Sequence, residues 1–365
     1  MKDVKHKLIV ISGGGTGGPS MAPLALARAY SQLDHEARFV FFGIDEALEQ
    51  KLFSASLRSL QADYYALPAG KWRRYFSWRN LFDIIQIVKA FFHAYRHLKY
   101  LQPDLIISAG SFASVPVVWA GKLLKIKILI HQQDIVPGLA NRLMSPWADK
   151  ISVCFPSSVA DYGKKAVVIG NPSEAVVISE EAKQAIRDKF KIKADRPFLF
   201  ITGGASGALA INKLVFAALP HLSSQWQIIH QSGAGKDQGA PMQNNYQVYP
   251  SIEQQDFLSL LACADIVVSR AGLGALTTLS ALAKPSIIIA MPHSHQEKNA
   301  AYFQAKAAAI VLAQAELDGK KLAEEIESLY QDENKRMRLA YEISSILPKE
   351  AAAKGADIIK MMLNK

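Results

Sequence analysis

The chain has 365 residues, of which 50% are hydrophobic and 20% are charged, so it has enough apolar residues for two folded domains and its composition excludes a disordered protein. Its formal net charge of +10 favours an anionic partner. The sequence has no run of about 18 apolar residues and no signal-peptide pattern. We therefore expect no membrane-spanning helix and no secretion. Cys154 and Cys263 lack partners at metal-ligand spacing, so we expect two buried thiols in a reducing cytoplasm and no metal site.

The first half of the chain alternates short apolar runs with stretches of helical periodicity. Strands are predicted at 7–11, 37–42, 105–108, 127–130 and 151–153. Helices are predicted between them, at 22–32, 45–53, 80–101 and 115–124. Alternation of this kind indicates a parallel sheet with helices on both faces. A further strand and turn at 167–172 end this half.

The pattern restarts after a polar helix at 180–190. Strands are predicted at 197–202, 227–230, 247–248, 265–269 and 286–290, with helices that include 255–263 and 275–283. The predicted fold class is therefore α/β, with two Rossmann-like domains that face a central cleft where ligands bind at the carboxyl ends of the strands. We expect one domain at 1–170, a second at 171–345, and a last helix within 346–365 that crosses back to the first domain.

Glycine-rich turns follow three of the predicted strands. The turn from Ser12 to Gly18 contains five glycines between a strand and a helix, an arrangement that exposes backbone N–H groups to a phosphate. The alternative is a tight turn that needs glycine only for positive φ angles. Similar turns occur at 203–207 and 269–275. Three such turns in two sheets suit two phosphorylated groups, one for each domain.

Basic and aromatic residues are interleaved immediately before the long helix predicted at 80–101. Six of them form our candidate membrane contact: Trp72, Arg73, Arg74, Phe76, Trp78 and Arg79. Rings at the depth of lipid headgroups and cations on anionic lipid are typical of a membrane-surface segment. Nucleic acid uses the same residue types, but no nucleic-acid-binding fold signature accompanies them, so we expect no nucleic-acid partner. Packing of this segment on the protein itself remains the alternative.

Six short motifs occur in a fixed order: GGTGG at 14–18, HQQD at 131–134, GNP at 170–172, GGASGA at 203–208, SRAG at 269–272 and HQEKNA at 295–300. Together they resemble the MurG family over residues 8–345. The resemblance implies a GT-B fold and transfer of N-acetylglucosamine from UDP-N-acetylglucosamine to the lipid-linked muramyl-pentapeptide precursor of peptidoglycan. It implies an undecaprenyl-pyrophosphoryl acceptor lipid, an inverting reaction without metal or other cofactor, and peripheral attachment to the anionic cytoplasmic face of the inner membrane.

The resemblance also assigns roles to residues. Thr16, Gly17 and Gly18 match the loop that faces the acceptor and the reacting sugar. The turn that holds the donor diphosphate is matched by Gly272, Leu273, Gly274 and Ala275. Gln296 and Asn299 match side chains that bind the sugar hydroxyls. Ala205 and Ser206 lie in the fourth motif, and Thr278 lies where the family has a glutamate for the ribose.

At several positions the chain departs from the family pattern. Pro19 stands in place of a histidine, and Glu174 stands in place of an arginine. Ala205 and Thr278 replace a serine and a glutamate, and the family reads Glu-Gln-Asn where this chain has 132–134. These departures leave the expected fold unchanged. They bear on which nucleotide sugar is the donor and on the rate of transfer.

Pro19 has no titratable side chain, so the general base that takes the proton of the acceptor hydroxyl must be another residue. Asp134 is our candidate, because it is a carboxylate in a loop after a strand; the alternative is that it caps the helix expected at 137–144. His131 is expected to be a packed histidine. Arg270 either assists the leaving diphosphate or is bound to backbone.

Three other functions remain open from the sequence. The chain could be a GT-B transferase for a different nucleotide sugar or lipid acceptor, as Glu174 and Thr278 suggest. It could be a GT-B-shaped binding protein with impaired catalysis, as Pro19 suggests. A nicotinamide dehydrogenase formally fits Gly13-x-Gly15-x-x-Gly18 followed by Asp45, but the repeated half argues against it.

Overall fold

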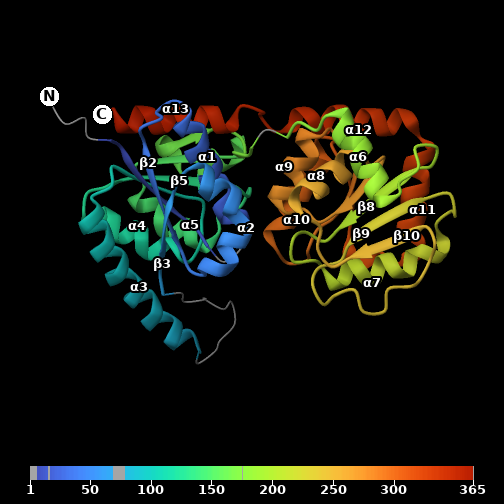
Figure 1. Cartoon of the computed structure of the whole chain (residues 1–365), viewed down its shortest axis with the longest axis horizontal. Coiled ribbons are helices and arrows are strands. Elements are labelled where there is room, and N and C mark those ends of the chain that lie inside the picture. Colours follow the sequence, from blue (N-terminus) through green and yellow to red (C-terminus); the bar gives the residue numbers. More distant parts are fainter. Residues whose placement is uncertain (1–5, 15–16, 69–78, 175, 365) are drawn as a thin grey trace. The chain divides into compact units, whose positions relative to one another are not determined.

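A computed structural model describes residues 6–14, 17–68, 79–174 and 176–364. The chain divides into two compact units (Figure 1). Unit 1 comprises Met1–Glu174 and Pro348–Lys365, and unit 2 comprises Ala175–Leu347. The last helix of the chain therefore belongs to the same unit as the first strand.

Unit 1 contains a seven-stranded parallel sheet with the strand order β3-β2-β1-β4-β5-β6-β7. Its strands are β1 (Leu8–Ser12), β2 (Arg38–Gly43), β3 (Asp63–Ala66), β4 (Leu105–Ser108), β5 (Lys127–Gln132), β6 (Lys150–Val153) and β7 (Ala166–Val168). Four of the strands are almost continuous runs of buried residues with an apolar centre, as expected for a sheet covered on both faces.

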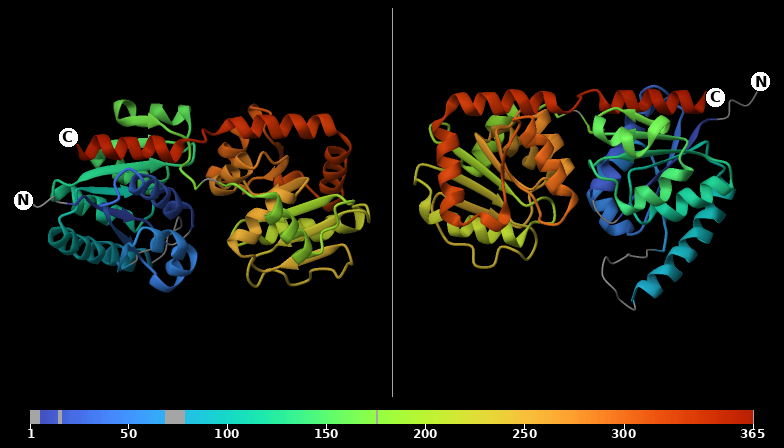
Figure 2. Two further views of the ribbon diagram at one scale, coloured as in Figure 1. Left: turned by 45° about the horizontal axis from the view of Figure 1, so that its top comes forward. Right: turned by 180° about the vertical axis from the view of Figure 1, so that it is seen from behind.

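Two hydrophobic clusters separate the sheet of unit 1 from its helices. The helices are α1 (Gly17–Ser31), α2 (Glu46–Ser59), α3 (Arg79–Leu101), α4 (Ser114–Leu123), α5 (Leu139–Met144) and α13 (Ala351–Leu363). Ile9 and Ile11 of β1 face the cluster formed by α1, α2 and α13, whereas Val10 faces the cluster formed by α3, α4 and α5. This alternation follows the two-residue period of a strand. Figure 2 shows α13, the red helix near the C-terminus, lying against α1.

Unit 2 contains a six-stranded parallel sheet with the order β10-β9-β8-β11-β12-β13. Its strands are β8 (Phe198–Thr202), β9 (Gln227–Gln231), β10 (Tyr246–Tyr249), β11 (Ile266–Ser269), β12 (Ser286–Ile289) and β13 (Ile310–Leu312). Its helices are α6 (Glu180–Phe190), α7 (Leu209–Ala218), α8 (Gln254–Cys263), α9 (Leu273–Ala281), α10 (His295–Ala305), α11 (Gly319–Gln331) and α12 (Glu333–Ile346). The fully buried Trp226 lies in a core shared by the sheet, α7 and α11.

The predicted α/β fold with two Rossmann-like halves is confirmed. The structure also contains elements that were not predicted by residue range, among them β3, β13, α7, α10, α11 and α12. Both cysteines are buried, as expected. Among the described helices, none is sufficiently long and apolar to cross a membrane.

Candidate active site

The glycine-rich turns lie where the strand order reverses in each sheet. In unit 1, β1 and β4 are neighbours in the sheet. The chain continues from β1 to β2 and β3 on one side, and from β4 to β5, β6 and β7 on the other, so the loops after β1 and β4 diverge. In unit 2, the loops after β8 and β11 have the same relationship. Ligands of open α/β sheets bind in the crevice at such a switch point, outside the carboxyl ends of the strands. The topology therefore gives each unit one candidate binding edge, and the three predicted turns lie on these edges.

The loop after β1 is held by hydrogen bonds to its surroundings. The backbone N–H of Gly14 donates to Ser20 Oγ at 3.0 Å, and Ser111 Oγ donates to the carbonyl of Gly14 at 3.1 Å. Gly14 has a φ of 132°, and a Cβ atom on Gly13 would lie 2.5 Å from Ser20 Oγ. Gly13 and Gly14 thus satisfy local steric needs. Ser111 also connects the loop after β4 with the loop after β1.

The predicted acceptor-side residues lie at the start of α1. Thr16 is outside the described residues, whereas Gly17 and Gly18 begin the helix. Pro19 occupies the first turn, where a backbone N–H has no partner within the helix and proline is tolerated. The replacement of the family histidine is therefore compatible with the helix, although proline supplies no titratable group.

Asp134 lies close in sequence to a residue that contacts the start of α1. Gln133 Nε2 donates to the carbonyl of Gly18 at 3.1 Å, which brings the segment after β5 to the amino end of α1. The buried Gln132 donates from Nε2 to the carbonyl of Asp134 at 2.6 Å and so fixes the turn. The alternative role for Asp134 as the cap of α5 is wrong, because Gly138 occupies the N-cap position.

His131 is a packed histidine, as expected. Its Nδ1 lies 3.0 Å from Ser152 Oγ and its Nε2 lies 3.3 Å from Asn171 Oδ1. Complete burial lowers the pKa of His131 to about 4, because desolvation disfavours the imidazolium. A neutral ring with both nitrogens engaged is a structural group rather than a base.

The loop after β8 displays Ala205 and Ser206 at the surface of unit 2. The N–H of Gly204 donates to Thr202 Oγ1 at 3.1 Å, which closes the turn directly after the strand. Gly207, with a φ of 68°, lies so near the next loop that a Cβ atom would be 1.9 Å from the carbonyl of Ser232. Glycine is therefore required at 207 by a close backbone approach.

The amino end of α9 is the strongest candidate for binding an anion. Gly272 is its N-cap, and within the described part of the chain no side chain caps the helix there. Gly274 is exposed, and a Cβ atom at this position would meet open space. Uncapped N–H groups and the helix dipole both favour a negative charge at this end. Leu273 and Ala275 complete the first turn of α9, and Leu273 is buried.

Gln296 and Asn299 lie beside this helix end. Asn299 is buried and donates from Nδ2 to the carbonyl of Ala271 at 3.3 Å. Gln296 Oε1 accepts from the N–H of Met291 at 3.1 Å, and its Nε2 lies 4.0 Å from the position that a Cβ atom on Gly272 would occupy. The structure thus brings together the predicted diphosphate turn and the predicted sugar-binding amides.

Arg270 is bound to backbone, which decides between its two predicted roles. Its Nη1 donates to the carbonyls of Ile289 and Ala290 at 3.0 and 2.9 Å, and its Nη2 donates to Gln314 Oε1 at 2.7 Å. The guanidinium therefore ties the end of β11 to the end of β12, just before the loop that leads to Gln296. Thr278 lies one turn into α9, where its Oγ1 donates to the carbonyl of Gly274 at 3.1 Å.

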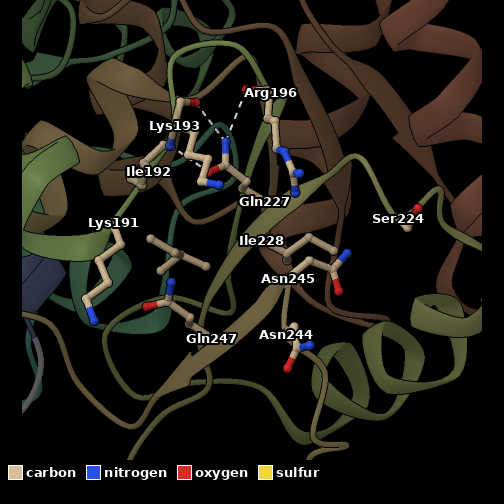
Figure 3. Close-up of a pocket in the computed structure, with 11 residues that line it drawn as sticks. Lys191, Ile192, Lys193, Arg196, Ser224, Gln227, Ile228, Asn244, Asn245 and Gln247 are labelled. Atoms are coloured by element: carbon tan, nitrogen blue, oxygen red, sulfur yellow. Dashed lines mark hydrogen bonds between the residues drawn. The ribbon is translucent and has the colours of Figure 1, made fainter.

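A cavity of about 290 Å³ lies at the opposite, amino-terminal edge of the unit 2 sheet (Figure 3). Gln227 fixes the segment at 193–196 that lines the cavity, because Gln227 Nε2 donates to the carbonyls of Lys193 and Arg196 at 2.8 and 3.2 Å. The loops after β8 and β11 lie at the other end of the strands, so the cavity is separated from them by the length of the sheet. It contains none of the predicted site residues.

Two Rossmann-like units with glycine loops at both switch points give this α/β chain the GT-B architecture. Models of the glycosyltransferase family 28 N-terminal and C-terminal domains match residues 9–153 and 198–359. The chain is 33% identical over 334 residues to the UDP-N-acetylglucosamine–N-acetylmuramyl-(pentapeptide) pyrophosphoryl-undecaprenol N-acetylglucosamine transferase of Clostridium botulinum strain Kyoto, covering 90% of this chain and 92% of the relative.

A second relative with the same name, from Geobacillus thermodenitrificans, is 33% identical over 340 residues, which cover 90% of this chain and 92% of the relative. The crystal structure of Acinetobacter baumannii MurG superposes with a TM-score of 0.73 at 24% identity, covering 97% of this chain and 99% of that one. The chain belongs to the MurG family of glycosyltransferases.

Proposed function

We propose that this protein transfers N-acetylglucosamine from UDP-N-acetylglucosamine to a muramyl-pentapeptide carried on pyrophosphoryl-undecaprenol. The observation that carries the proposal is the uncapped amino end of α9 beside Gln296 and Asn299, in a chain of this family. The relatives' names specify this donor and this acceptor.

The donor half of the reaction is assigned to unit 2. Backbone N–H groups from Gly272 to Ala275 would bind the diphosphate, and they would stabilise the charge that develops on it as UDP leaves. The amides of Gln296 and Asn299 would bind sugar hydroxyls. Ala205, Ser206 and Thr278 would contact the nucleotide from the loop after β8 and from the second turn of α9.

The acceptor half is assigned to the loop at Thr16, Gly17 and Gly18 of unit 1. An acceptor hydroxyl oxygen attacks C1 of the sugar, the bond between C1 and the diphosphate oxygen breaks, and UDP departs with the bonding electrons. We assign Asp134 as the base that takes the hydroxyl proton, because Gln133 places this segment against Gly18.

We further propose that unit 1 binds an anionic membrane as a peripheral protein on the cytoplasmic face of the inner membrane. The basic and aromatic segment at 72–78 lies outside the described residues, and only the backbone of Arg79 is described. The adjoining α3 supports the proposal: Ile85 and Phe92 are 47% and 64% exposed on the face that also carries the exposed Lys89 and Arg96. Apolar side chains among cations are typical of contact with anionic lipid.

A donor panel tests the proposal. The purified protein is incubated with a lipid-linked muramyl-pentapeptide acceptor and, in separate reactions, with UDP-N-acetylglucosamine, UDP-glucose and a dTDP-sugar. We expect acceptor-dependent UDP release and disaccharide formation with UDP-N-acetylglucosamine. Failure to bind this donor would refute the proposal. Turnover of the dTDP-sugar alone would establish the second candidate, a transferase with another donor, which is favoured by a threonine at 278.

A further inference from the structure

A second loop supports the donor-side glycine loop of unit 2 from behind. This supporting loop comprises residues 232–236, after β9. Gly233 has a φ of 92°, and a Cβ atom there would lie 2.5 Å from the carbonyl of Ser206. Together with the close approach of Gly207 to Ser232, this geometry places the two loops in direct backbone contact. The position of the 203–207 loop therefore depends on that of the supporting loop.

Buried side chains fix the supporting loop to the core. Asn212 of α7 donates from Nδ2 to the carbonyls of Ser232 and Lys236 at 3.0 and 2.8 Å. Its Oδ1 lies 3.1 Å from His230 Nε2, and His230 Nδ1 lies 2.8 Å from the hydroxyl of Tyr246. Asn212 and His230 are almost fully buried, so this network is rigid and shielded from water.

Lys236 connects this rigid network to the glycine loop. Its ammonium donates to the carbonyls of Ser206 and Gly207 at 2.7 and 3.0 Å. Both are charge-assisted hydrogen bonds to backbone, and they hold two consecutive peptide groups of a loop in which Ala205 and Ser206 are exposed. No motif of the sequence analysis included Lys236.

We propose that Lys236 is a positioning residue for the donor: it holds the 203–207 loop in the conformation that binds the nucleotide sugar. This inference rests on the proposed function, because it assumes that the 203–207 loop contacts the donor. Lys236 acts through the loop, so its loss weakens donor binding more than it slows the chemical step.

The test compares two variants. Lys236→Met keeps a side chain of similar length but removes the ammonium N–H groups that bind the loop, whereas Lys236→Arg keeps a cation. Lys213→Met is the matched control, because Lys213 is an exposed lysine on α7 of the same unit. We expect Lys236→Met to raise the donor KM and the Kd for UDP about tenfold, equivalent to about 1.4 kcal/mol, with kcat within about twofold of the parent. Lys236→Arg should recover most of the loss, and Lys213→Met should behave as the parent protein.

Hydrogen exchange supplies a measurement that does not depend on turnover. The amides of residues 204–208 should exchange faster in Lys236→Met than in the parent, whereas amides in β8 should not change. A parent that neither binds nor transfers the sugar refutes the proposed function, and with it the donor role of the loop. A parent that transfers the sugar, together with a Lys236→Met variant of unchanged KM, unchanged UDP affinity and unchanged exchange, refutes the positioning role alone.

Discussion

Arg28 and Glu174 form an ion pair that joins α1 to the segment through which the chain leaves unit 1. Glu174 Oε1 accepts from Arg28 Nη1 and also from Ser56 Oγ of α2, the latter at 3.1 Å. The reversed charge at position 174 is thus balanced within unit 1. A carboxylate with a cation and a hydroxyl as partners is a structural group of the unit, and we expect it to have little effect on a bound diphosphate.

Substitutions at this pair separate structure from donor binding. Glu174→Gln should change the donor KM by less than about twofold, because Glu174 and Arg28 are both partly exposed and solvent screens the charge that the substitution leaves on Arg28. Glu174→Arg should lower the free energy of unfolding of unit 1 by about 1 kcal/mol through repulsion with Arg28, and the double variant Arg28→Glu/Glu174→Arg should recover it. Urea unfolding and steady-state kinetics measure both effects. A large gain in donor affinity in Glu174→Gln would show that the carboxylate repels the donor.

Gln296→Ala should weaken binding of the sugar part of the donor. Loss of one neutral hydrogen bond costs about 1 kcal/mol, so the Kd for UDP-N-acetylglucosamine should rise about fivefold while the Kd for UDP changes little. Calorimetric titration with both ligands measures the difference. Glu297→Ala, at the exposed neighbouring position, is the control. Equal losses for the two ligands would contradict a contact with the sugar.

Asp134→Asn should lower kcat by about 100-fold or more with little change in either KM, as expected when a general base is lost and the side chain keeps its shape. The exposed Asp161 provides the control variant Asp161→Asn. A single-turnover measurement with saturating donor isolates the chemical step. If Asp134→Asn retains the parent rate, another group takes the proton.

Stability should fall as the pH is lowered from 6.5 toward 4. Burial lowers the pKa of both His131 and His230 to about 4, so the unfolded chain binds protons in this range before the native protein does. At pH 5, each histidine should cost roughly 2 kcal/mol of stability relative to neutral pH. Urea unfolding at pH 7.5 and pH 5 measures the loss. His230→Gln should remove about half of it, and an unchanged pH dependence in that variant would argue against a neutral buried ring.

Phe92→Glu should weaken binding to anionic vesicles. The substitution places a carboxylate on the exposed apolar face of α3, where it opposes both the apolar contact and the attraction of Lys89 and Arg96 to lipid. Co-sedimentation with phosphatidylglycerol vesicles measures the bound fraction. Tyr341→Glu is the control, since Tyr341 is a 72% exposed aromatic residue on α12 of unit 2. Equal binding by both variants and the parent would refute a membrane contact through α3.

Strands and helices could be predicted where the hydrophobic pattern of the segment matches its burial in the folded protein. The strand β4 was predicted at its observed bounds, because a strand buried on both faces is a continuous apolar run between turns. β3 was missed because it reads Asp-Tyr-Tyr-Ala and is partly exposed at the sheet edge. For α11, by contrast, the spacing of Leu322, Ile326 and Leu329 is a helical signal that is present in the sequence.

The candidate site was predictable to the extent that it depends on contiguous residues. Glycine turns between a strand and a helix are local signals, so the loops were found without knowledge of the strand order. The sequence could not decide between the two roles of Arg270, because the carbonyls that it binds lie at the end of β12 and just after it, and these become neighbours only in the assembled sheet. The same holds for Arg28 and Glu174, and for the contact of Lys236 with Ser206.

The helix α13 makes the completion of unit 1 a late event in biosynthesis. Its Gly355 approaches Leu26 so closely that a Cβ atom would lie 2.0 Å from a leucine methyl carbon, and Ile359 and Met362 belong to the same core. All of unit 2 is therefore translated before the helix that covers α1 has been made. Until then, the nascent first unit leaves the apolar face of α1 uncovered, and exposed apolar surface of this kind favours aggregation of a nascent chain.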